Sequence, residues 1–275
     1  IWDPQNVVQV DEINLNVPAA ARAAVLCLLY YAREDGEGEV WAGTAAGQIW
    51  RISLRAHYSP LQSEASTASN HVIDTGGYTV VEMERPHLKH QGALRCMLRV
   101  GDDVWTGSYS GEIFVWDALH ADKAANSPEP SADRMLQRGH GAVKAMAMLH
   151  SDLVLTGHRS GAVQIWTIEG IRQSWASGNA SVKCAVEAGG LAWTGHADGN
   201  FRLWSLLGDR LQLFRSVKAH KTAILAMVRD ADSVWSCTKN GTLRQWSIAL
   251  LLEDRTVEPG VLISSNRNAN VLPSA

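Results

Sequence analysis

Residues 104–116 read VWTGSYSGEIFVW, the pattern of two short apolar strands joined by a tight turn. The first strand runs into Gly107, the turn is centred on Gly111, and the second strand ends on Trp116, five residues after the turn glycine. Both strands are short and rich in Val, Ile and Trp, which favours β structure over helix. One such pair cannot bury its own apolar face, so stacked copies are needed to form a core.

Four other stretches repeat this pattern with changes. They begin at Val40, Val154, Ala192 and Val234 and end on Ile52, Trp166, Trp204 and Trp246. Their turn glycines are Gly47, Gly161, Gly199 and Gly241, and successive turn glycines along the chain are 64, 50, 38 and 42 residues apart. The last two intervals match a repeat that contains one four-stranded sheet, about 40–45 residues. Segments 58–70 and 118–133 lengthen the first two intervals and are expected to be exposed loops.

Each full unit is predicted to contain four strands. In the third unit, alternating apolar residues predict strands over 142–149, 153–157, 162–167 and 171–176. In the fourth unit, the same order predicts strands over 181–186, 191–195, 201–205 and 211–214. The dipeptides Asp198-Gly199 and Asn240-Gly241 suit the positive φ of a tight hairpin turn.

The pattern Thr-Gly-x-x-x-Gly, followed by alternating apolar residues and Trp, resembles the WD-repeat β-propeller family. Dipeptides similar to the family's Gly-His precede three units, at Lys89-His90, Gly139-His140 and Ala219-His220. The resemblance covers roughly residues 20–250 and implies an all-β fold, a β-propeller of four-stranded blades. Because most propellers have more than five blades, we expect these five units to belong to a ring of six or seven; a closed five-bladed ring is the alternative.

We expect residues 1–275 to form a single propeller domain with units at about 20–85, 90–138, 140–176, 180–216 and 220–265. Residues 1–16 are expected to supply a strand to a neighbouring or closing blade, and 257–264 another outer strand. The chain opens on Ile1-Trp2-Asp3, which is similar to the strand end Val115-Trp116-Asp117. We therefore expect the sequence to be a segment of a longer, multi-domain protein.

In the WD-repeat family, a His before the first strand, a Ser or Thr on the second, an Asp in the hairpin turn and the terminal Trp form a hydrogen-bonded set. No unit of this chain carries all four, and the first ends on Ile52 in place of Trp. The members present are His140, Thr156 and Trp166 in the third unit, Thr194, Asp198 and Trp204 in the fourth, and His220, Ser236 and Trp246 in the fifth. Blade stability is then expected to depend more on apolar packing.

The resemblance implies a non-catalytic scaffold for protein–protein interactions. A second, narrower resemblance rests on the Trp at the second-strand position of four units, Trp41, Trp105, Trp193 and Trp235. This Val-Trp-Thr-Gly-like pattern looks like the propellers N-terminal to inositol polyphosphate 5-phosphatase catalytic domains. It implies the alternative function, a regulatory or targeting propeller of such a multi-domain phosphatase.

We predict no catalytic, cofactor or metal site. His158 and His196 occupy equivalent positions, but no Asp, Glu or Cys accompanies both at a regular offset, so local capping is favoured over metal binding. Repeated Asp residues fall at tight turns, where the carboxylate bonds its own backbone. Neither G-x-S-x-G nor a phosphate-binding G-x-x-x-x-G-K-[ST] occurs.

Basic residues gather before and within the first strands. Lys144, Lys183 and Lys221 lie at or near equivalent positions and, with His140 and His220, form a candidate partner-binding rim. Such a rim would attract acidic or phosphorylated proteins and peptides. Ordinary solvated charge is the alternative for these side chains.

The composition excludes several function classes. A net charge of −3 gives no general attraction to nucleic acid. No apolar run reaches the ~18 residues of a membrane span. Four cysteines form no C-x-x-C pair, and Cys27, Cys96 and Cys184 fall in apolar runs that suit small buried side chains. We therefore expect a reducing, cytoplasmic location.

Overall fold

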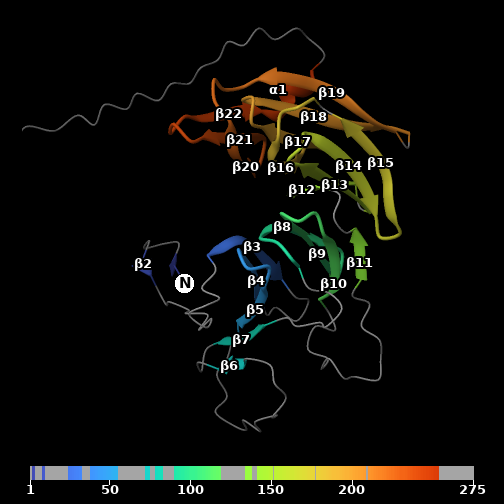
Figure 1. The fold of residues 1–275 in the computed structure, drawn as a ribbon. Coiled ribbons are helices and arrows are strands. Elements are labelled where there is room, and N and C mark those ends of the chain that lie inside the picture. The colour runs from blue at the N-terminus through green and yellow to red at the C-terminus, as the bar shows by residue number, and fades with distance from the viewer. Residues whose placement is uncertain are drawn as a thin grey trace, which may run out of the picture. The chain divides into compact units, whose positions relative to one another are not determined.

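The computed structural model describes residues 2–3, 8–9, 24–32, 38–54, 72–74, 78–82, 90–118, 134–137, 141–150, 152–176, 178–208 and 210–253. The described residues are almost all in strands and tight turns (Figure 1). The chain divides into two compact units. One is Ile1–Met146 with Ile168–Gly170, and the other is Ala147–Thr167 with Ile171–Ala275.

The first compact unit contains two large antiparallel sheets. The strands of the first sheet are β3 (Val25–Ala32), β4 (Gly38–Thr44), β5 (Ile49–Leu54), β6 (Val72–Asp74) and β7 (Tyr78–Glu82), in the order β3-β4-β5-β7-β6. The strands of the second sheet are β8 (Leu94–Val100), β9 (Asp103–Ser108), β10 (Ile113–Asp117) and β11 (Arg134–Gln137), in chain order. A separate two-stranded sheet pairs β1 (Trp2–Asp3) with β2 (Val8–Gln9).

Three further sheets follow along the chain, each with its strands in chain order. The third sheet contains β12 (Val143–His150), β13 (Leu153–His158), β14 (Ala162–Thr167) and β15 (Gly170–Ala176). The fourth contains β16 (Val182–Ala188), β17 (Leu191–His196), β18 (Asn200–Leu207) and β19 (Arg210–Lys218). The fifth contains β20 (Ile224–Asp230), β21 (Ser233–Thr238) and β22 (Leu243–Ser247), after which the chain forms the short helix α1 (Ile248–Leu252).

The all-β prediction of repeated propeller blades is confirmed, and each predicted strand of the third and fourth units overlaps an observed one. The first and fifth sheets differ from the predicted four strands: the first has five, and in the fifth three strands are followed by a helix. Ala and Leu in α1 favour helix, and Ser247 caps it by accepting a hydrogen bond from the backbone N–H of Leu250 at 3.5 Å. The loop at 58–70, nearly all of 118–133 and the strand at 257–264 lie outside the described residues, as do the parts of 1–16 that flank β1 and β2.

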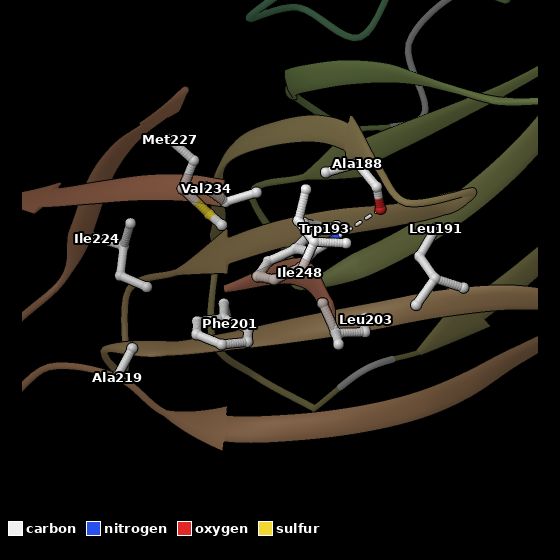
Figure 2. Close-up of a cluster of buried hydrophobic side chains, with 10 residues drawn as sticks. All are labelled: Ala188, Leu191, Trp193, Phe201, Leu203, Ala219, Ile224, Met227, Val234 and Ile248. Atoms are coloured by element: carbon white, nitrogen blue, oxygen red, sulfur yellow. Dashed lines mark hydrogen bonds between the residues drawn. The ribbon is translucent and has the colours of Figure 1, made fainter. Parts of the chain in front are cut away.

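Apolar packing between consecutive sheets forms the core of each compact unit. In the first unit, Trp41 and Tyr31 from the first sheet lie in one cluster with Leu94, Phe114 and other residues of the second. In the other unit, Trp193 and Phe201 from the fourth sheet pack with Ile224 and Val234 from the fifth (Figure 2). Burial of large apolar side chains stabilises such clusters by about 1.5–3 kcal/mol each.

The turn glycines of all five repeats have positive φ, between 78° and 92°. At Gly199 a second constraint applies, because an added Cβ would lie 2.2 Å from the carbonyl oxygen of His220. The Gly199 carbonyl also accepts hydrogen bonds from the backbone N–H groups of Ala219 and His220, at 3.1 and 2.9 Å. The hairpin turn of the fourth sheet therefore lies directly against the segment that enters the fifth.

Candidate functional site

The first strands of four sheets share a β-bulge near their start. The register of pairing with the second strand shifts between Val25 and Cys27, Leu94 and Cys96, Val182 and Cys184, and Ile224 and Ala226. The residues at the shifts are Leu26, Arg95, Lys183 and Leu225. Because a bulge re-aims the side chain of its extra residue, these positions are suited to present side chains for binding. Lys144 is the second residue of β12, as Arg95 is the second residue of β8, so the two occupy equivalent positions.

Two of these basic residues surround one aromatic ring in the first compact unit. The Nζ atom of Lys144 lies 4.6 Å from the centroid of the Tyr109 ring, and the Arg95 guanidinium carbon lies 5.7 Å from it. Tyr109 sits at the turn between β9 and β10, and 38% of its surface is exposed. Cation–π attraction of this kind contributes about 0.5–1 kcal/mol at an exposed site and holds both cations near the surface.

The other predicted rim residues differ in burial and in their position relative to the bulges. Lys183 is half-buried at the bulge of β16, and Lys221 is exposed three residues before β20 rather than at a bulge. His220 is only 4% exposed, and its Nε2 atom lies 2.8 Å from the hydroxyl of Ser236. His140 lies outside the described residues. The first compact unit therefore presents Arg95 and Lys144, and the second presents Lys183 and Lys221, while the imidazole of His220 belongs to the sheet interior.

The second sheet contains a buried polar set with a member that the sequence analysis missed. His90 Nε2 lies 2.8 Å from the hydroxyl of Thr106, which also accepts a hydrogen bond from Trp116 Nε1 at 2.8 Å. The carboxylate of Glu112 lies 3.5 Å from His90 Nδ1 and accepts hydrogen bonds from Ser108 and Ser110. Glu112 thus occupies the carboxylate role that the family gives to a turn Asp.

Burial and bonding shift the pKa values of this set. Burial lowers the pKa of His90, although Glu112 opposes the shift. Burial alone would raise the pKa of Glu112, but hydrogen bonds from His90, Ser108, Ser110 and the Gln91 backbone lower it to about 2. Glu112 is therefore ionised at neutral pH inside the sheet.

In the third and fourth sheets, the strand-end histidines belong to similar sets. His158 Nε2 lies 3.0 Å from the Thr156 hydroxyl, which accepts from Trp166 Nε1 at 2.9 Å. In the fourth sheet, Thr194 likewise bridges His196 and Trp204, at 2.8 Å to each. His158 and His196 are 2% and 0% exposed. Both imidazoles thus contact a threonine hydroxyl of their own strand.

The tautomer of His196 follows from its partners. Its Nδ1 atom lies 3.1 Å from the carbonyl oxygen of Ala180, which can only accept, so Nδ1 carries the proton and Nε2 accepts from Thr194. Burial lowers the pKa of His196 to about 4. The fourth sheet thus obtains its imidazole from the second strand, although no His precedes its first strand.

These buried sets contain residue types that are used in acid–base catalysis. Their side chains, however, are not accessible to a substrate. Thr106 is fully buried, and its hydroxyl oxygen already contacts both His90 and Trp116. A nucleophile must reach a reacting atom, which this position does not allow.

Among the described residues, no group of three or more His, Cys, Asp or Glu side chains is arranged to hold a metal ion. The described part of the chain also contains no helix with the length and apolar character that a membrane crossing requires.

Sequence reasoning counted Arg95 among the basic residues of the first strands but assigned only three lysines to the rim, and it did not single out Tyr109. A signal for Arg95 was present, since it follows Leu94 as Lys183 follows Val182. Tyr109 lies in the predicted turn around Gly111, and its contact with Lys144 depends on the approach of the next strand. That approach is not visible in the spacing of either residue.

Solved structures similar to this chain include two WD40 propellers. The chain is similar to the WD40 β-propeller domain of Doa1 (TM-score 0.58, 15% identity, covering 84% of this chain and 67% of that one). It is also similar to the RRP9 WD40 repeats (TM-score 0.59, 14% identity, 83% and 61%) and to a chain of the Mitotic Checkpoint Complex (TM-score 0.58, 17% identity, 82% and 64%). No family model matches the sequence. At these identities the similarities show the fold alone, a β-propeller, and this chain spans less than two thirds of the last two structures.

Proposed function

We propose that this chain is a non-catalytic platform of WD-repeat type that binds other proteins. The proposal rests on one observation: the chain buries some of its polar side chains inside the sheets and leaves others at the surface. The histidines and Glu112 that resemble catalytic groups are bonded inside the sheets, while basic side chains stand at the surface ends of the first strands. Exposed side chains on a rigid β frame are typical of interaction surfaces.

Acidic or phosphorylated protein segments are the partners that the basic side chains of each compact unit favour. Arg95 is exposed, and the described part of the chain places no carboxylate within ion-pair distance of it. Guanidinium groups bind carboxylate and phosphate through two parallel hydrogen bonds. Complementary charge also raises association rates, an effect that salt screens.

Charge reversal tests this proposal. The purified chain would be titrated into fluorescein-labelled peptides that share one sequence with acidic, phosphoserine or neutral residues at the variable positions. We expect the acidic and phosphorylated peptides to bind, and Arg95→Glu/Lys144→Glu and Lys183→Glu/Lys221→Glu to weaken binding by about tenfold or more. Lys239→Glu, an exposed change in the turn between β21 and β22, is the control. Equal affinities for all variants, or for the neutral peptide, would contradict the proposal.

A reducing, cytoplasmic location is part of the proposal. All four cysteines are free, and burial raises the thiol pKa of Cys27 to about 11 and that of Cys184 to about 12. Thiols with raised pKa are poor nucleophiles and persist unpaired in a reducing compartment. The alternative, a regulatory propeller of a 5-phosphatase, gains no support from the structural similarities, and the protein sequence beyond Ala275 would test it.

A further inference from the structure

Large apolar side chains are exposed on the outer strands of the third and fourth sheets. In β15, Ile171 and Trp175 are 50% and 42% exposed, and in β19, Leu213 and Phe214 are 39% and 40% exposed. Both strands lie at the edge of their sheets. We call these four residues the edge surface.

Contacts between the two sheets hold Trp175 in place. Its ring packs edge-to-face on buried Trp204 of β18, with centroids 6.1 Å apart. Two residues earlier, Gln173 Oε1 accepts a hydrogen bond of 2.8 Å from the backbone N–H of Leu211 in β19. Leu213 pairs directly with Trp204 across the β18–β19 ladder, and Phe214 is the bulge residue that follows it. Trp175 and Leu213 therefore contact or adjoin the same buried indole.

All charged residues within β15 and β19 are positive. β15 contains Arg172, and β19 contains Arg210, Arg215 and Lys218, while neither strand contains an Asp or Glu. Arg172, Arg210 and Lys218 are exposed. An edge strand also has backbone N–H and C=O groups with which an extended segment can pair.

We propose that the edge surface binds an extended segment of another protein in which large apolar residues alternate with Asp or Glu. Such a segment places its apolar side chains on Trp175 and Leu213 and its carboxylates near Arg172 and Arg210. Exposed Trp in a fixed orientation is a frequent energetic centre of interfaces, because it buries a large area at low entropic cost. The proposal rests on the proposed interaction function but uses none of the rim residues.

A binding titration in the full chain tests it. The probe is a short fluorescein-labelled peptide in which Leu and Phe alternate with Asp and Glu, measured by fluorescence anisotropy. Two comparison peptides replace the acids with Lys or the apolar residues with Ser. We expect only the first peptide to bind, and the double variant Trp175→Ser/Leu213→Ser to weaken it by about tenfold or more. Leu250→Ser, which changes an exposed Leu of α1 to the same residue, should leave the affinity unchanged.

A second variant covers the case in which the first one fails to fold. Arg172→Glu/Arg210→Glu changes two exposed side chains and should weaken binding of the acidic peptide while improving that of the Lys peptide. Thermal unfolding of each variant shows whether it is folded. Lys183→Glu/Lys221→Glu separates the two proposals: if it abolishes binding of the same peptide, the rim and not the edge surface is the site.

Three results would overturn the inference. One is an affinity of Trp175→Ser/Leu213→Ser, when folded, equal to that of the unchanged chain. Another is equal binding of the Lys peptide. The third is concentration-dependent self-association in analytical ultracentrifugation that Trp175→Ser/Leu213→Ser removes, because a second copy of the chain would then be the occupant of the edge surface.

Discussion

The hydroxyl group of Thr194 holds two buried side chains at once, the indole of Trp204 and the imidazole of His196. Thr194→Val keeps the shape of the side chain but leaves both nitrogens without this partner. We expect it to lower the free energy of unfolding by about 2–4 kcal/mol, measured by urea denaturation. Thr222→Val, at an exposed position, should change it by less than about 0.5 kcal/mol. Similar losses in the two variants would contradict a structural role for the buried set.

His196 should make the protein less stable in mild acid. Its pKa is lowered from 6.5 to about 4 in the folded protein, so the unfolded chain binds a proton that the folded chain does not. The stabilisation is therefore complete above pH 6.5 and is lost as the pH falls toward 4. Between pH 7 and pH 5 we expect a loss of about 2 kcal/mol from this group.

The measurement compares urea denaturation at the two pH values for the unchanged chain and for His196→Gln. The variant should show a smaller pH dependence, because Gln does not titrate. His90 and His220 also have lowered pKa values and act in the same direction, but they are common to both proteins. The same pH dependence in both would show that His196 is not the group responsible.

Single residues show where sequence reasoning succeeded and where it could not. The Thr and Trp of each set stand at fixed distances from the turn glycine, so their pairing was predictable. Glu112 was missed because it lies after Gly111 and reaches back to His90, which is 22 residues away in the chain. Similarly, the fourth sheet has no His before its first strand, and His196 of the second strand takes that place. Its contact with Thr194 forms only in the folded sheet.

At the scale of elements, the hairpin turn of the fourth sheet depends on Gly199 for two reasons, positive φ and contact with the His220 carbonyl. Gly208 offers a matched comparison, since its φ is +58° but nothing lies within 4 Å of an added Cβ. We expect Gly208→Ala to cost about 1 kcal/mol and Gly199→Ala clearly more, about 3 kcal/mol. Thermal unfolding monitored by circular dichroism measures both, and equal costs would exclude a close approach at Gly199.

The strands of the third and fourth units were predictable because their apolar residues alternate between turn glycines. The bulges were not, because they depend on the pairing of two strands rather than on the pattern of one. The bulges nevertheless decide which basic residues are equivalent: Arg95 and Lys183 share a bulge position, and Lys221 does not. The end of the fifth sheet also differed, since Ala and Leu after Ser247 form helix α1.

At the scale of the whole molecule, the last sheet has a more exposed face than those before it. Ile49, Ile113, Val163 and Phe201, each two residues after a turn glycine, are at most 2% exposed, whereas the equivalent Leu243 is 59% exposed. We expect Phe201→Ala to cost about 3–5 kcal/mol of unfolding free energy and Leu243→Ala less than about 1 kcal/mol. A large cost at Leu243 in denaturant titration would mean that this face is covered in solution.

The number of blades in a complete ring stays a prediction, because it depends on sheets that the repeat count of this chain does not reveal. What the sequence does predict is the internal repeat itself, in which a Ser or Thr hydroxyl of the second strand accepts the indole N–H of the terminal Trp. This bond is present in the second, third, fourth and fifth sheets.

Hydrogen exchange of the indole N–H groups, followed by NMR, tests that repeat most directly. The indoles of Trp116, Trp166 and Trp204 are buried and bonded, so they should exchange only when their sheets open, at least about 100-fold more slowly than exposed Trp175. Trp246, which is half-buried, should lie between these limits. If Trp116, Trp166 and Trp204 exchange as fast as Trp175, the sheets are not built around these bonds, contrary to the predicted repeat.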